Sequence, residues 1–427
     1  METIALDIER VVAGGHGLAH HQGQAVFVPF AAPGDRLRVA LSPGGRGYLK
    51  GEIREILAPG PWRVEPPCPL HGQCGGCRLL HLAPAGQGRV REEMVAEAVT
   101  RVGRLALEEG VLAPILPAPA PLGYRRRAGF KVRRVGERVL LGFFAAASHR
   151  VVDLPGCPVL HPRLAELLGP LRELIATLSV AARVPQVDGV CGDNGPALVF
   201  HLLREPGGSD RAAMAGFARD HGVLQIWAQM GRKGTLRPLV EGPDPCYRVG
   251  DVVLGYRPEM FTQANFEQNR PLAELVLEQA GRGERVVDLF CGVGNFTLPL
   301  AGRFRQVLGL EGYGPAVARG RQNAREAGLT GVTFQQADLL VGPDPRRLPW
   351  GREDVVVLDP PRQGAVALAE RLAAAPPRRV VYVSCDPATF ARDAARLVRG
   401  GLRLAAVVPV EMLPQTHHVE LTALFLG

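Results

Sequence analysis

The chain has 427 residues, of which 46% are hydrophobic and 22% are charged, a composition typical of a globular protein with room for two to four domains. Its 50 basic and 42 acidic residues leave a net charge of +8, a modest excess that fits a nucleic-acid partner. No apolar run has transmembrane length and no leader is visible, so we expect no membrane association and a cytoplasmic location.

Short alternating stretches fill residues 4–56. Turn signals at Gly14-Gly15, Pro33-Gly34-Asp35 and Pro43-Gly44-Gly45 separate them at spacings typical of a small β-barrel. The strand-like stretches are 4–8, 25–28, 36–39 and 51–56. We predict a five-stranded barrel of the oligonucleotide-binding type over residues 1–57, with a small β-module used for docking as the alternative.

The eight cysteines indicate metal binding or catalysis, because a cytoplasmic chain does not keep a disulfide framework. The segment Cys68–Cys77, with Cys74 between its ends, has the spacing C-x5-C-x2-C, and its glycines let the backbone bend around a metal centre. Cys157, in a loop flanked by prolines, is the predicted fourth ligand. At this point an iron–sulfur cluster and a zinc site completed by His71 or His81 are both open.

The middle of the chain gives weaker signals. A helical pattern runs over 87–107, and the segment from Tyr124 to Arg134 is rich in basic residues. This basic segment suits contact with an RNA backbone, and it equally suits a solvated strand face. Helical and strand-like patterns alternate from 158 to 253 without a chemical constellation. We assign residues 58–255 to a central α+β domain that binds RNA.

From residue 256 onward, strands and helices alternate. The first three strands are predicted at 285–290, 306–310 and 331–334. The first runs into the glycine loop Cys291–Gly294, the second ends in Glu311, and Asp338 follows the third. This order is typical of a nucleoside-binding parallel sheet, in which the acid after the second strand binds ribose hydroxyls. One Gly-x-Gly does not distinguish a nicotinamide cofactor from S-adenosylmethionine.

The fourth and fifth strands of this sheet end in residues with chemical potential. The fourth, 354–358, ends in Asp359-Pro360-Pro361, a rigid segment that projects a carboxylate into the crevice. A similar segment holds the target nitrogen in amino-group methyltransferases, so it favours methyl transfer over hydride transfer. The fifth strand, 379–383, is broken by Pro387 and places Cys385 at its carboxyl end, where ligands bind in an open α/β sheet.

Two of these residues have plain structural alternatives. Cys385 can act as a nucleophile, whereas a free cysteine is commonly a small buried apolar residue. Glu420, just before a terminal apolar strand at 421–426, is a candidate acid or base, and a surface carboxylate at a strand edge is the other interpretation. The preceding His417-His418 pair fits a solvated turn.

With these motifs assembled, the chain resembles the RNA 5-methyluridine methyltransferase family, and specifically its ribosomal RNA members, over nearly its whole length. The matching segments are Gly14–Ala19, Val26–Pro29, Pro33–Asp35, Pro66–Cys77, Phe261–Asn265, Asp288–Phe296, Asp359–Gly364, Ser384–Pro387 and His418–Glu420. Two positions depart from the family pattern: Arg126 stands where asparagine is usual, and Leu80 where glutamine is usual. Both lie outside the chemistry and concern RNA contacts and the surroundings of the cluster.

The resemblance implies an α/β fold: a C-terminal Rossmann-like sheet dependent on S-adenosylmethionine over 256–427, an N-terminal TRAM barrel and a central domain with a [4Fe–4S] cluster. The implied cluster ligands are Cys68, Cys74, Cys77 and Cys157. The residues implied to line the cofactor site are Gln263, Phe290, Asn295, Glu311, Asp338 and Asp359. It further implies Cys385 as nucleophile and Glu420 as base, with Asp359 holding the uracil edge or the donor end of the cofactor.

The expected reaction is methylation of uridine C5 in RNA by S-adenosylmethionine, through a covalent bond between Cys385 and C6. We expect 23S ribosomal RNA as partner, with an unpaired uridine turned out of its stack, and a monomeric enzyme. The alternatives are a transfer-RNA 5-methyluridine methyltransferase, an exocyclic-amine N-methyltransferase that uses Asp359-Pro360-Pro361, and an RNA-docking protein with a degenerate sheet. The sequence names neither the nucleotide nor a role for the cluster.

Overall fold

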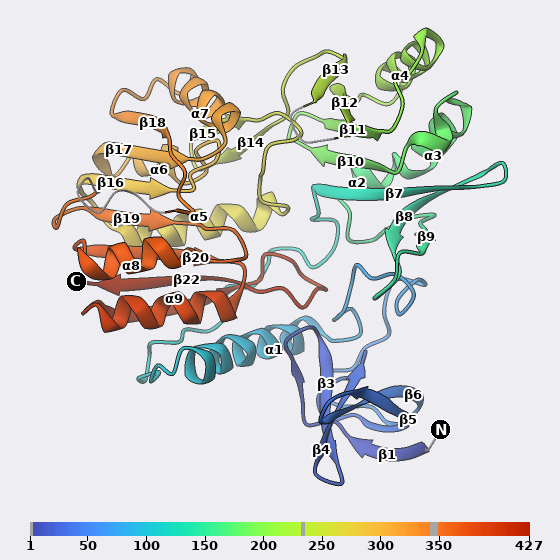
Figure 1. The fold of residues 1–427 in the computed structure, drawn as a ribbon, viewed down its shortest axis with the longest axis horizontal. Coiled ribbons are helices and arrows are strands. Elements are labelled where there is room, and N and C mark those ends of the chain that lie inside the picture. The colour runs from blue at the N-terminus through green and yellow to red at the C-terminus, as the bar shows by residue number, and fades with distance from the viewer. Residues whose placement is uncertain (1–2, 232–234, 342–348) are drawn as a thin grey trace.

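The computed structural model describes residues 3–231, 235–341 and 349–427, and the strands in these ranges form three large sheets and one hairpin (Figure 1). The sheets follow one another along the chain, from the blue N-terminal barrel through the green central sheet to the orange and red C-terminal sheet. Within the described ranges, no helix has the length and apolar character that a membrane span requires.

The N-terminal sheet has six strands in the order β1-β5-β6-β4-β3-β2. Their bounds are β1 Thr3–Asp7, β2 Arg10–Val12, β3 His16–His21, β4 Gln24–Pro29, β5 Arg36–Gly45 and β6 Tyr48–Ala58. The predicted barrel of five strands is therefore one strand short. The stretches 10–12 and 16–21 were not predicted as strands. The first has only three residues, and the second consists of histidine, glycine, leucine and alanine, with no β-branched side chain.

The central sheet has seven strands in the order β13-β12-β11-β10-β7-β8-β9. Its strands are β7 Arg127–Val135, β8 Arg138–Phe144, β9 Val151–Asp153, β10 Gln186–Cys191, β11 Pro196–Leu202, β12 Gln225–Met230 and β13 Leu236–Val240. The accompanying helices are α2 Pro162–Ala165, α3 Leu168–Thr177, the short η2 Ala181–Arg183 and α4 Gly208–Asp220. The expected α+β character of this region is thus present.

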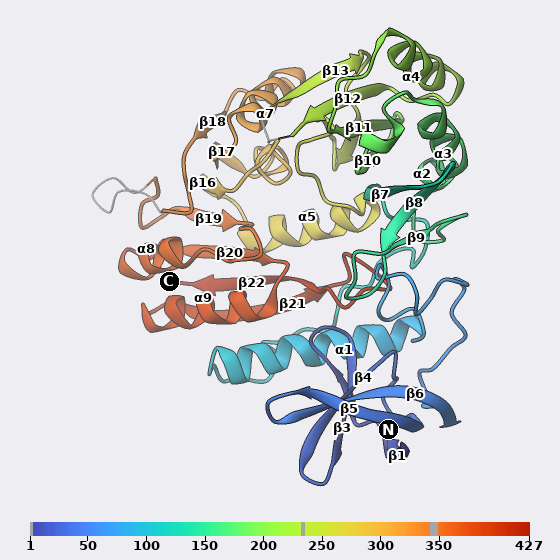
Figure 2. The same ribbon diagram turned by 45° about the vertical axis from the view of Figure 1, so that its right-hand side comes forward.

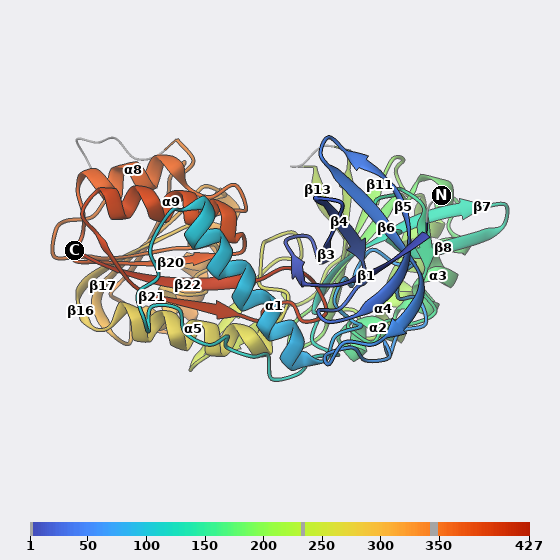
Figure 3. The same ribbon diagram turned by 90° about the horizontal axis from the view of Figure 1, so that it is seen from below.

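Helix α1, Pro84–Glu97, precedes the central sheet and continues as the π-turn η1, Ala98–Val102. The helix predicted over 87–107 thus begins three residues earlier and ends five residues earlier than expected. It ends early because Arg104 takes a left-handed backbone conformation. Helix α1 contacts β2 of the barrel and β21 of the C-terminal sheet. Figures 1 and 2 show it lying between the barrel and the red strands, and Figure 3 shows the same helix from below.

The C-terminal sheet has seven strands in the order β18-β17-β16-β19-β20-β22-β21. Its elements are α5 Phe266–Ala280, β16 Gly283–Leu289, α6 Thr297–Leu300, β17 Phe304–Glu311, α7 Gly314–Glu326, β18 Val332–Gln336, β19 Val355–Leu358, α8 Val366–Ala374, β20 Arg379–Ser384, α9 Pro387–Arg399, β21 Arg403–Val410 and β22 Glu420–Leu426. The first five strands in chain order are parallel, and β22 runs antiparallel to both of its neighbours. The strand order reverses between β16 and β19, which is where such sheets open a crevice for ligands.

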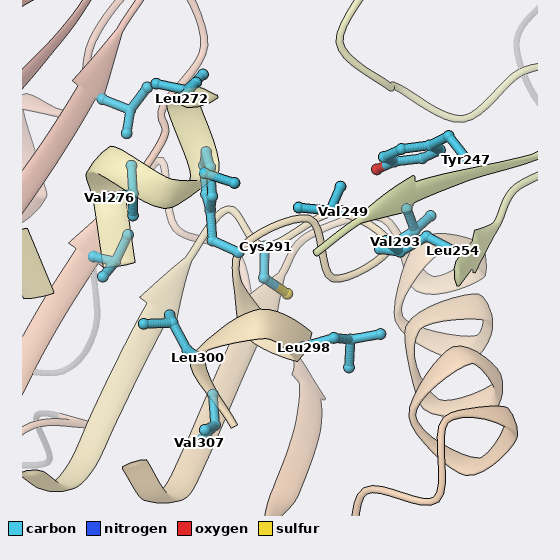
Figure 4. Packing of buried hydrophobic residues seen from close by; sticks show 14 of the residues in the cluster. Tyr247, Val249, Leu254, Leu272, Val276, Cys291, Val293, Leu298, Leu300 and Val307 are labelled. Carbon is cyan, nitrogen blue, oxygen red and sulfur yellow. The ribbon is translucent and has the colours of Figure 1, made fainter. Parts of the chain in front are cut away.

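The glycine loop after β16 rests on a closely packed core. The hairpin formed by β14, Cys246–Val249, and β15, Val252–Gly255, packs on this core together with α5. Figure 4 shows Cys291 among side chains from these elements, including Tyr247, Leu272 and Leu298. Burial raises the pKa of the Cys291 thiol well above its usual value, so this cysteine supports the loop as a neutral apolar residue.

Candidate active site

Cys385 lies in the two-residue step between β20 and α9. The strand ends at Ser384, and Pro387 occupies the first turn of the helix, where its missing N–H costs no hydrogen bond. The side chain of Asp386 caps the helix by accepting from the N–H groups of Ala388 at 3.0 Å and Thr389 at 2.9 Å. The structure therefore confirms that Cys385 sits at the carboxyl end of a strand, and it leaves the side chain half-buried.

Glu420 is brought to Cys385 by strand register. Strand β22 runs antiparallel to β20 and pairs Leu421 with Ser384. Glu420 and Cys385 are the next residues beyond this pair, and the charge of Glu420 acts on the Cys385 thiol. Glu420 is only 7% exposed, so the expected alternative of a surface carboxylate does not apply.

Asp359 completes a group of three with Cys385 and Glu420. It follows β19, and its N–H donates to the carbonyl of Leu289 at 3.3 Å. Burial raises the pKa of Glu420 well above its usual value, and the neighbouring carboxylate of Asp359 raises it further. Burial likewise raises the pKa of Asp359 to about 7. Two carboxyl groups in one buried crevice resist simultaneous ionisation, which suits them to hold and release a proton.

Burial, and then the charges of Glu420 and Asp359, raise the pKa of the Cys385 thiol to about 12. Arg362 opposes this shift for Cys385 and also for Glu420. The guanidinium of Arg362 lies 3.0 Å from Nδ1 of His418, whose pKa is lowered to about 4 by burial first and then by His417. His418 is therefore a neutral partner of Arg362, and the histidine pair is not the solvated turn that its sequence suggested.

The first two strands place further acids next to the glycine loop. Glu311 accepts from the N–H of Gly292 at 3.2 Å and from that of Tyr313 at 2.8 Å. The buried Asp288 accepts from the hydroxyl of Thr297 at 2.5 Å, and its other oxygen, Oδ1, has no hydrogen-bond partner among the described residues. Burial, followed by Asp359 and Glu311 as lesser causes, raises the pKa of Asp288 to about 7.

The remaining residues implied to line the cofactor site lie in different settings. Gln263 is buried, Phe290 takes a left-handed backbone conformation with φ of 65°, and Asp338 is exposed two residues beyond β18. Asn295 has internal partners: its amide exchanges hydrogen bonds of 2.8 and 3.0 Å with Asn269. Besides burial, Asp359 and Glu311 both raise the pKa of Asp288, so these three acidic side chains lie close enough to act on one another.

The four predicted cluster ligands line one cavity. The lining cysteines are Cys68, Cys74, Cys77 and Cys157. His71, Leu80 and Phe143 also line it, whereas His81 does not. Among residues 3–231, 235–341 and 349–427, no three His, Cys, Asp or Glu side chains form a group that could hold one metal ion.

Three side chains of the basic segment that begins at Tyr124 make internal contacts. The Tyr124 hydroxyl donates to the carbonyl of Pro414 at 2.6 Å, and Arg126 pairs with Glu267 at 2.7 Å. Arg127 donates to two backbone carbonyls at 2.7 Å. Neither an RNA contact nor a solvated strand face describes these three side chains, because they join the central region to the C-terminal one.

Comparison with known proteins places this geometry in a family. The model described as tRNA (Uracil-5-)-methyltransferase matches residues 245–337, and the TRAM domain model matches residues 2–53. The 23S rRNA (uracil(1939)-C(5))-methyltransferase RlmD of Alkalilimnicola ehrlichii is 43% identical to this chain, over 96% of this chain and 94% of its own length. The RlmD of Thiobacillus denitrificans is 40% identical over 100% and 99%. The chain belongs to the RNA 5-methyluridine methyltransferase family.

A solved structure shares the whole fold. The tRNA (uracil-54, C5)-methyltransferase of Pyrococcus abyssi, crystallised in complex with S-adenosyl-L-homocysteine, covers 99% of both chains with a TM-score of 0.75 at 24% sequence identity. This likeness shows the fold, and family membership confirms the resemblance drawn from the motifs. The expected α/β methyltransferase fold with an N-terminal TRAM region is also confirmed.

Within this family fold, two central side chains had no role in the sequence prediction. Asp288 is the second-last residue of the first strand, three positions before the glycine loop, and an acid in that position is a signal that could have been used. Arg362 ends the Asp-Pro-Pro segment, where an arginine gives no sign that it lies beside a thiol. Arg362 comes close to Cys385 only because β19, β20 and β22 are neighbouring strands of the folded sheet.

Proposed function

We propose that this protein transfers a methyl group from S-adenosylmethionine to C5 of a uridine in 23S ribosomal RNA, at the position that the names of its relatives give as uracil 1939. The observation that carries the proposal is the juxtaposition of Cys385, Glu420 and Asp359 at one edge of the sheet. Identities of 43% and 40% over nearly full length to RlmD proteins support the ribosomal substrate. Transfer RNA remains the alternative substrate.

Cys385 activates the pyrimidine ring. Its sulfur adds to C6, and the ring electrons displaced toward the carbonyl oxygen make C5 nucleophilic. S-adenosylmethionine, when bound, supplies the methyl group that C5 takes up. Glu420 then removes the proton that C5 still carries, and the electron pair of the broken C5–H bond expels the Cys385 sulfur and restores the double bond between C5 and C6.

Arg362 is the side chain that favours ionisation in this crevice. It lowers the pKa of both Cys385 and Glu420 against the effect of burial. We propose that Arg362 stabilises the anionic state in which a proton has left the thiol. We assign to Asp359 the task of holding the uracil edge or the donor end of the cofactor, where a fixed carboxylate positions either one.

The crevice fits a cationic methyl donor. The buried Oδ1 of Asp288 has no hydrogen-bond partner among the described residues, and acidic groups predominate around it. A sulfonium ion supplies the positive charge that this group of carboxyls lacks. We propose that Gln263, Phe290, Asn295, Glu311 and Asp338 contribute the remaining contacts, with Glu311 on the ribose hydroxyls.

We propose that Cys68, Cys74, Cys77 and Cys157 hold a [4Fe–4S] cluster. Four cysteines around one partly apolar cavity supply the full ligand set that such a cluster requires. The methyl transfer outlined above uses no electron transfer, so the cluster has no redox task in it.

Iron and sulfide analysis tests the cluster. Protein purified without oxygen is expected to contain about four iron atoms per chain, and the Cys77→Ser variant to lose most of them. Cys191→Ser is a matched control, because Cys191 is buried outside the cavity. Stoichiometric zinc in place of iron would contradict the proposal.

We also propose the division of labour that the sequence suggests. Residues 1–57 and 58–255 bind RNA and the cluster, and residues 256–427 bind the cofactor and carry the chemistry. The TRAM match at 2–53 and the separate sheets support this division. A monomer acting in the cytoplasm fits a ribosomal RNA substrate.

A 5-fluorouridine substrate tests the main proposal. Fluorine replaces the C5 hydrogen that Glu420 removes, so the reaction stops with RNA bound to Cys385. We expect a denaturation-resistant complex with a 23S ribosomal RNA fragment and S-adenosylmethionine, and none with Cys385→Ala. A complex with transfer RNA alone would reassign the substrate. Full methylation by Cys385→Ala would instead support N-methylation through Asp359-Pro360-Pro361.

A further inference from the structure

The loop between β21 and β22, residues 411–419, leads directly into Glu420 and is held by a buried arginine of α1. Arg91 is fully buried, with 0% exposure, which is rare for an arginine. Its guanidinium pairs with Glu411 at 2.6 Å and donates to backbone carbonyls of the loop. The accepting carbonyls are those of Thr416 at 2.8 Å, His418 at 3.2 Å and Leu413 at 3.3 Å.

Gln87, one turn earlier on the same face of α1, holds the tip of this loop. Its amide donates to Oε1 of Gln415 at 2.7 Å and accepts from the N–H of Gln415 at 2.9 Å. The carbonyl of Gln415 accepts in turn from the N–H groups of Arg78 and Leu79, both at 2.9 Å. Gln415 itself takes a left-handed conformation with φ of 69°, so the tip depends on these contacts.

The far end of the loop carries the groups that face the nucleophile. His418, whose carbonyl binds Arg91, contacts Arg362 through its ring, and Glu420 follows two residues later. Both Arg362 and Glu420 act electrostatically on Cys385. No hydrogen bond of the described residues joins Arg91 to Cys385 or Glu420 directly, so any effect of Arg91 on them passes through the loop.

We propose that Arg91 is a positioning residue for Glu420: by fixing the 411–419 loop, it aims the carboxylate at the proton on C5. This inference rests on the proposed function. Addition of Cys385 to C6 needs β20, Arg362 and the RNA, whereas proton removal needs Glu420 itself, which the loop leads into directly. Loosening the loop therefore slows the last step more than the first, and the covalent protein–RNA complex accumulates with natural, unfluorinated RNA.

The test uses the full-length protein with both partners of the buried ion pair changed. Arg91→Met combined with Glu411→Gln removes the loop contacts without leaving a buried charge unpaired. Arg91→Lys keeps the charge and loses the fork of donors. Arg89→Met is the matched control, because Arg89 lies on the exposed face of α1 and pairs with Glu93, outside the loop.

We expect both Arg91 variants to bind S-adenosylmethionine like the wild type, to methylate about 10- to 100-fold more slowly, and to accumulate a complex whose uracil already carries the new methyl group. Glu420→Gln serves as the reference for this behaviour. Arg89→Met is expected to match the wild type. Amide hydrogen exchange of residues 411–419 is expected to rise in the Arg91 variants alone.

Three results would overturn the proposal: wild-type turnover in the Arg91 variants, slow turnover without a covalent complex, or unchanged exchange in the loop. A wild type that methylates no RNA would overturn the proposed function instead. Hydrogen exchange would then still decide whether Arg91 fixes the loop. Should the double variant fail to fold, Arg91→Lys carries the same readouts.

Discussion

Cys385 and Glu420, the proposed nucleophile and the proposed base, lie close together because two strands run in opposite directions. In the parallel part of the sheet, β19 and β20 bring Asp359 and Cys385 to the same edge. A parallel strand has its last residue at this edge, whereas an antiparallel strand has its first residue there. Strand β22 runs antiparallel to β20, and its first residue is Glu420. The antiparallel direction of β22 therefore places Glu420 beside Asp359 and Cys385. In a fully parallel sheet, a loop would have to supply this third group.

Glu420→Gln is expected to separate the two halves of the reaction. The amide cannot accept the C5 proton, while addition of Cys385 to C6 and methyl transfer remain available. We expect turnover to fall by about 10²- to 10⁴-fold and a covalent complex with natural RNA to appear on denaturing gels. Glu326→Gln, a change at an exposed position of α7, is the control. Loss of turnover without the complex would mean that Glu420 acts before the addition step.

The pKa of Asp359, raised by burial to about 7, predicts an acid limb in the pH profile. Below that pH the carboxyl is protonated and neutral, so it loses its function as a fixed anion; above it the ionised form predominates. We expect kcat/KM to fall as the pH drops from 8 to 6, and Asp359→Asn to be slower but flat over this range. An identical acid limb in Asp359→Asn would assign that limb to another group.

At the residue scale, the sequence predicted positions along the strands correctly. Cys385 follows the end of β20 and Glu420 begins β22, as expected, and their roles as nucleophile and base stay predictions. Arg362 and Arg91 were missed, since an arginine in a loop and an arginine in an amphipathic helix both look solvated. Their partners, His418 and Glu411, lie far away in the sequence, and only the fold brings them together.

Among the elements, the glycine loop after β16 concentrates unusual backbone conformations. Phe290, Gly292 and Gly294 all have positive φ, at 65°, 55° and 106°. For Phe290 this is a strained conformation, of the kind that persists where surrounding structure holds it and where a ligand site needs it. The core in Figure 4, on which the loop rests, provides that support.

Gly294→Ala is expected to weaken cofactor binding. A Cβ atom at this position would lie 2.9 Å from Cγ of Leu298, and φ of +106° is strained for alanine. Strain of about 1–3 kcal/mol, present only in the cofactor-binding conformation of the loop, corresponds to a loss of affinity of about 5- to 150-fold, which calorimetry with S-adenosylmethionine measures. Gly208→Ala, at an open position without positive φ, is the control. Unchanged affinity would show that the loop adjusts freely.

Element prediction was accurate for the C-terminal sheet and weaker elsewhere. Strand β20 was expected at 379–383 and found at Arg379–Ser384, because strands buried on both faces are continuous apolar runs. Strand β3 in the barrel escaped prediction because its apolar signal is short. Tyr124 and Arg126 of the basic segment make internal contacts that the sequence did not indicate, because their partners, Pro414 and Glu267, come from other parts of the chain.

For the molecule as a whole, the net charge of +8 is the long-range signal for RNA. Near the cysteine cavity, Arg125 lies over the ring of Phe143 and Lys131 over that of Phe144. Rings flanked by cations are a common surface for single-stranded nucleic acid, because bases stack on the rings while the cations meet phosphates.

RNA binding is therefore expected to depend strongly on salt. Each phosphate neutralised contributes a slope of about −0.7 in log affinity against log salt for single-stranded RNA, and Arg125→Ala is expected to reduce the slope by about one such unit. Filter binding over a salt series measures both. Affinity for S-adenosylmethionine, measured in the same series, is the internal control. A slope that Arg125→Ala leaves unchanged would place the RNA on another surface.

The contacts between α1 and the 411–419 loop also have a consequence for biosynthesis. Gln87 and Arg91 leave the ribosome more than 300 residues before their partners, which are 320 to 328 positions further along the chain. Until that last segment arrives, α1 exposes polar groups that will end up buried, and the base has no fixed place. We therefore expect that a nascent chain cannot complete turnover on the ribosomal RNA that surrounds it, and that catalytic competence begins only when the two distant segments have joined.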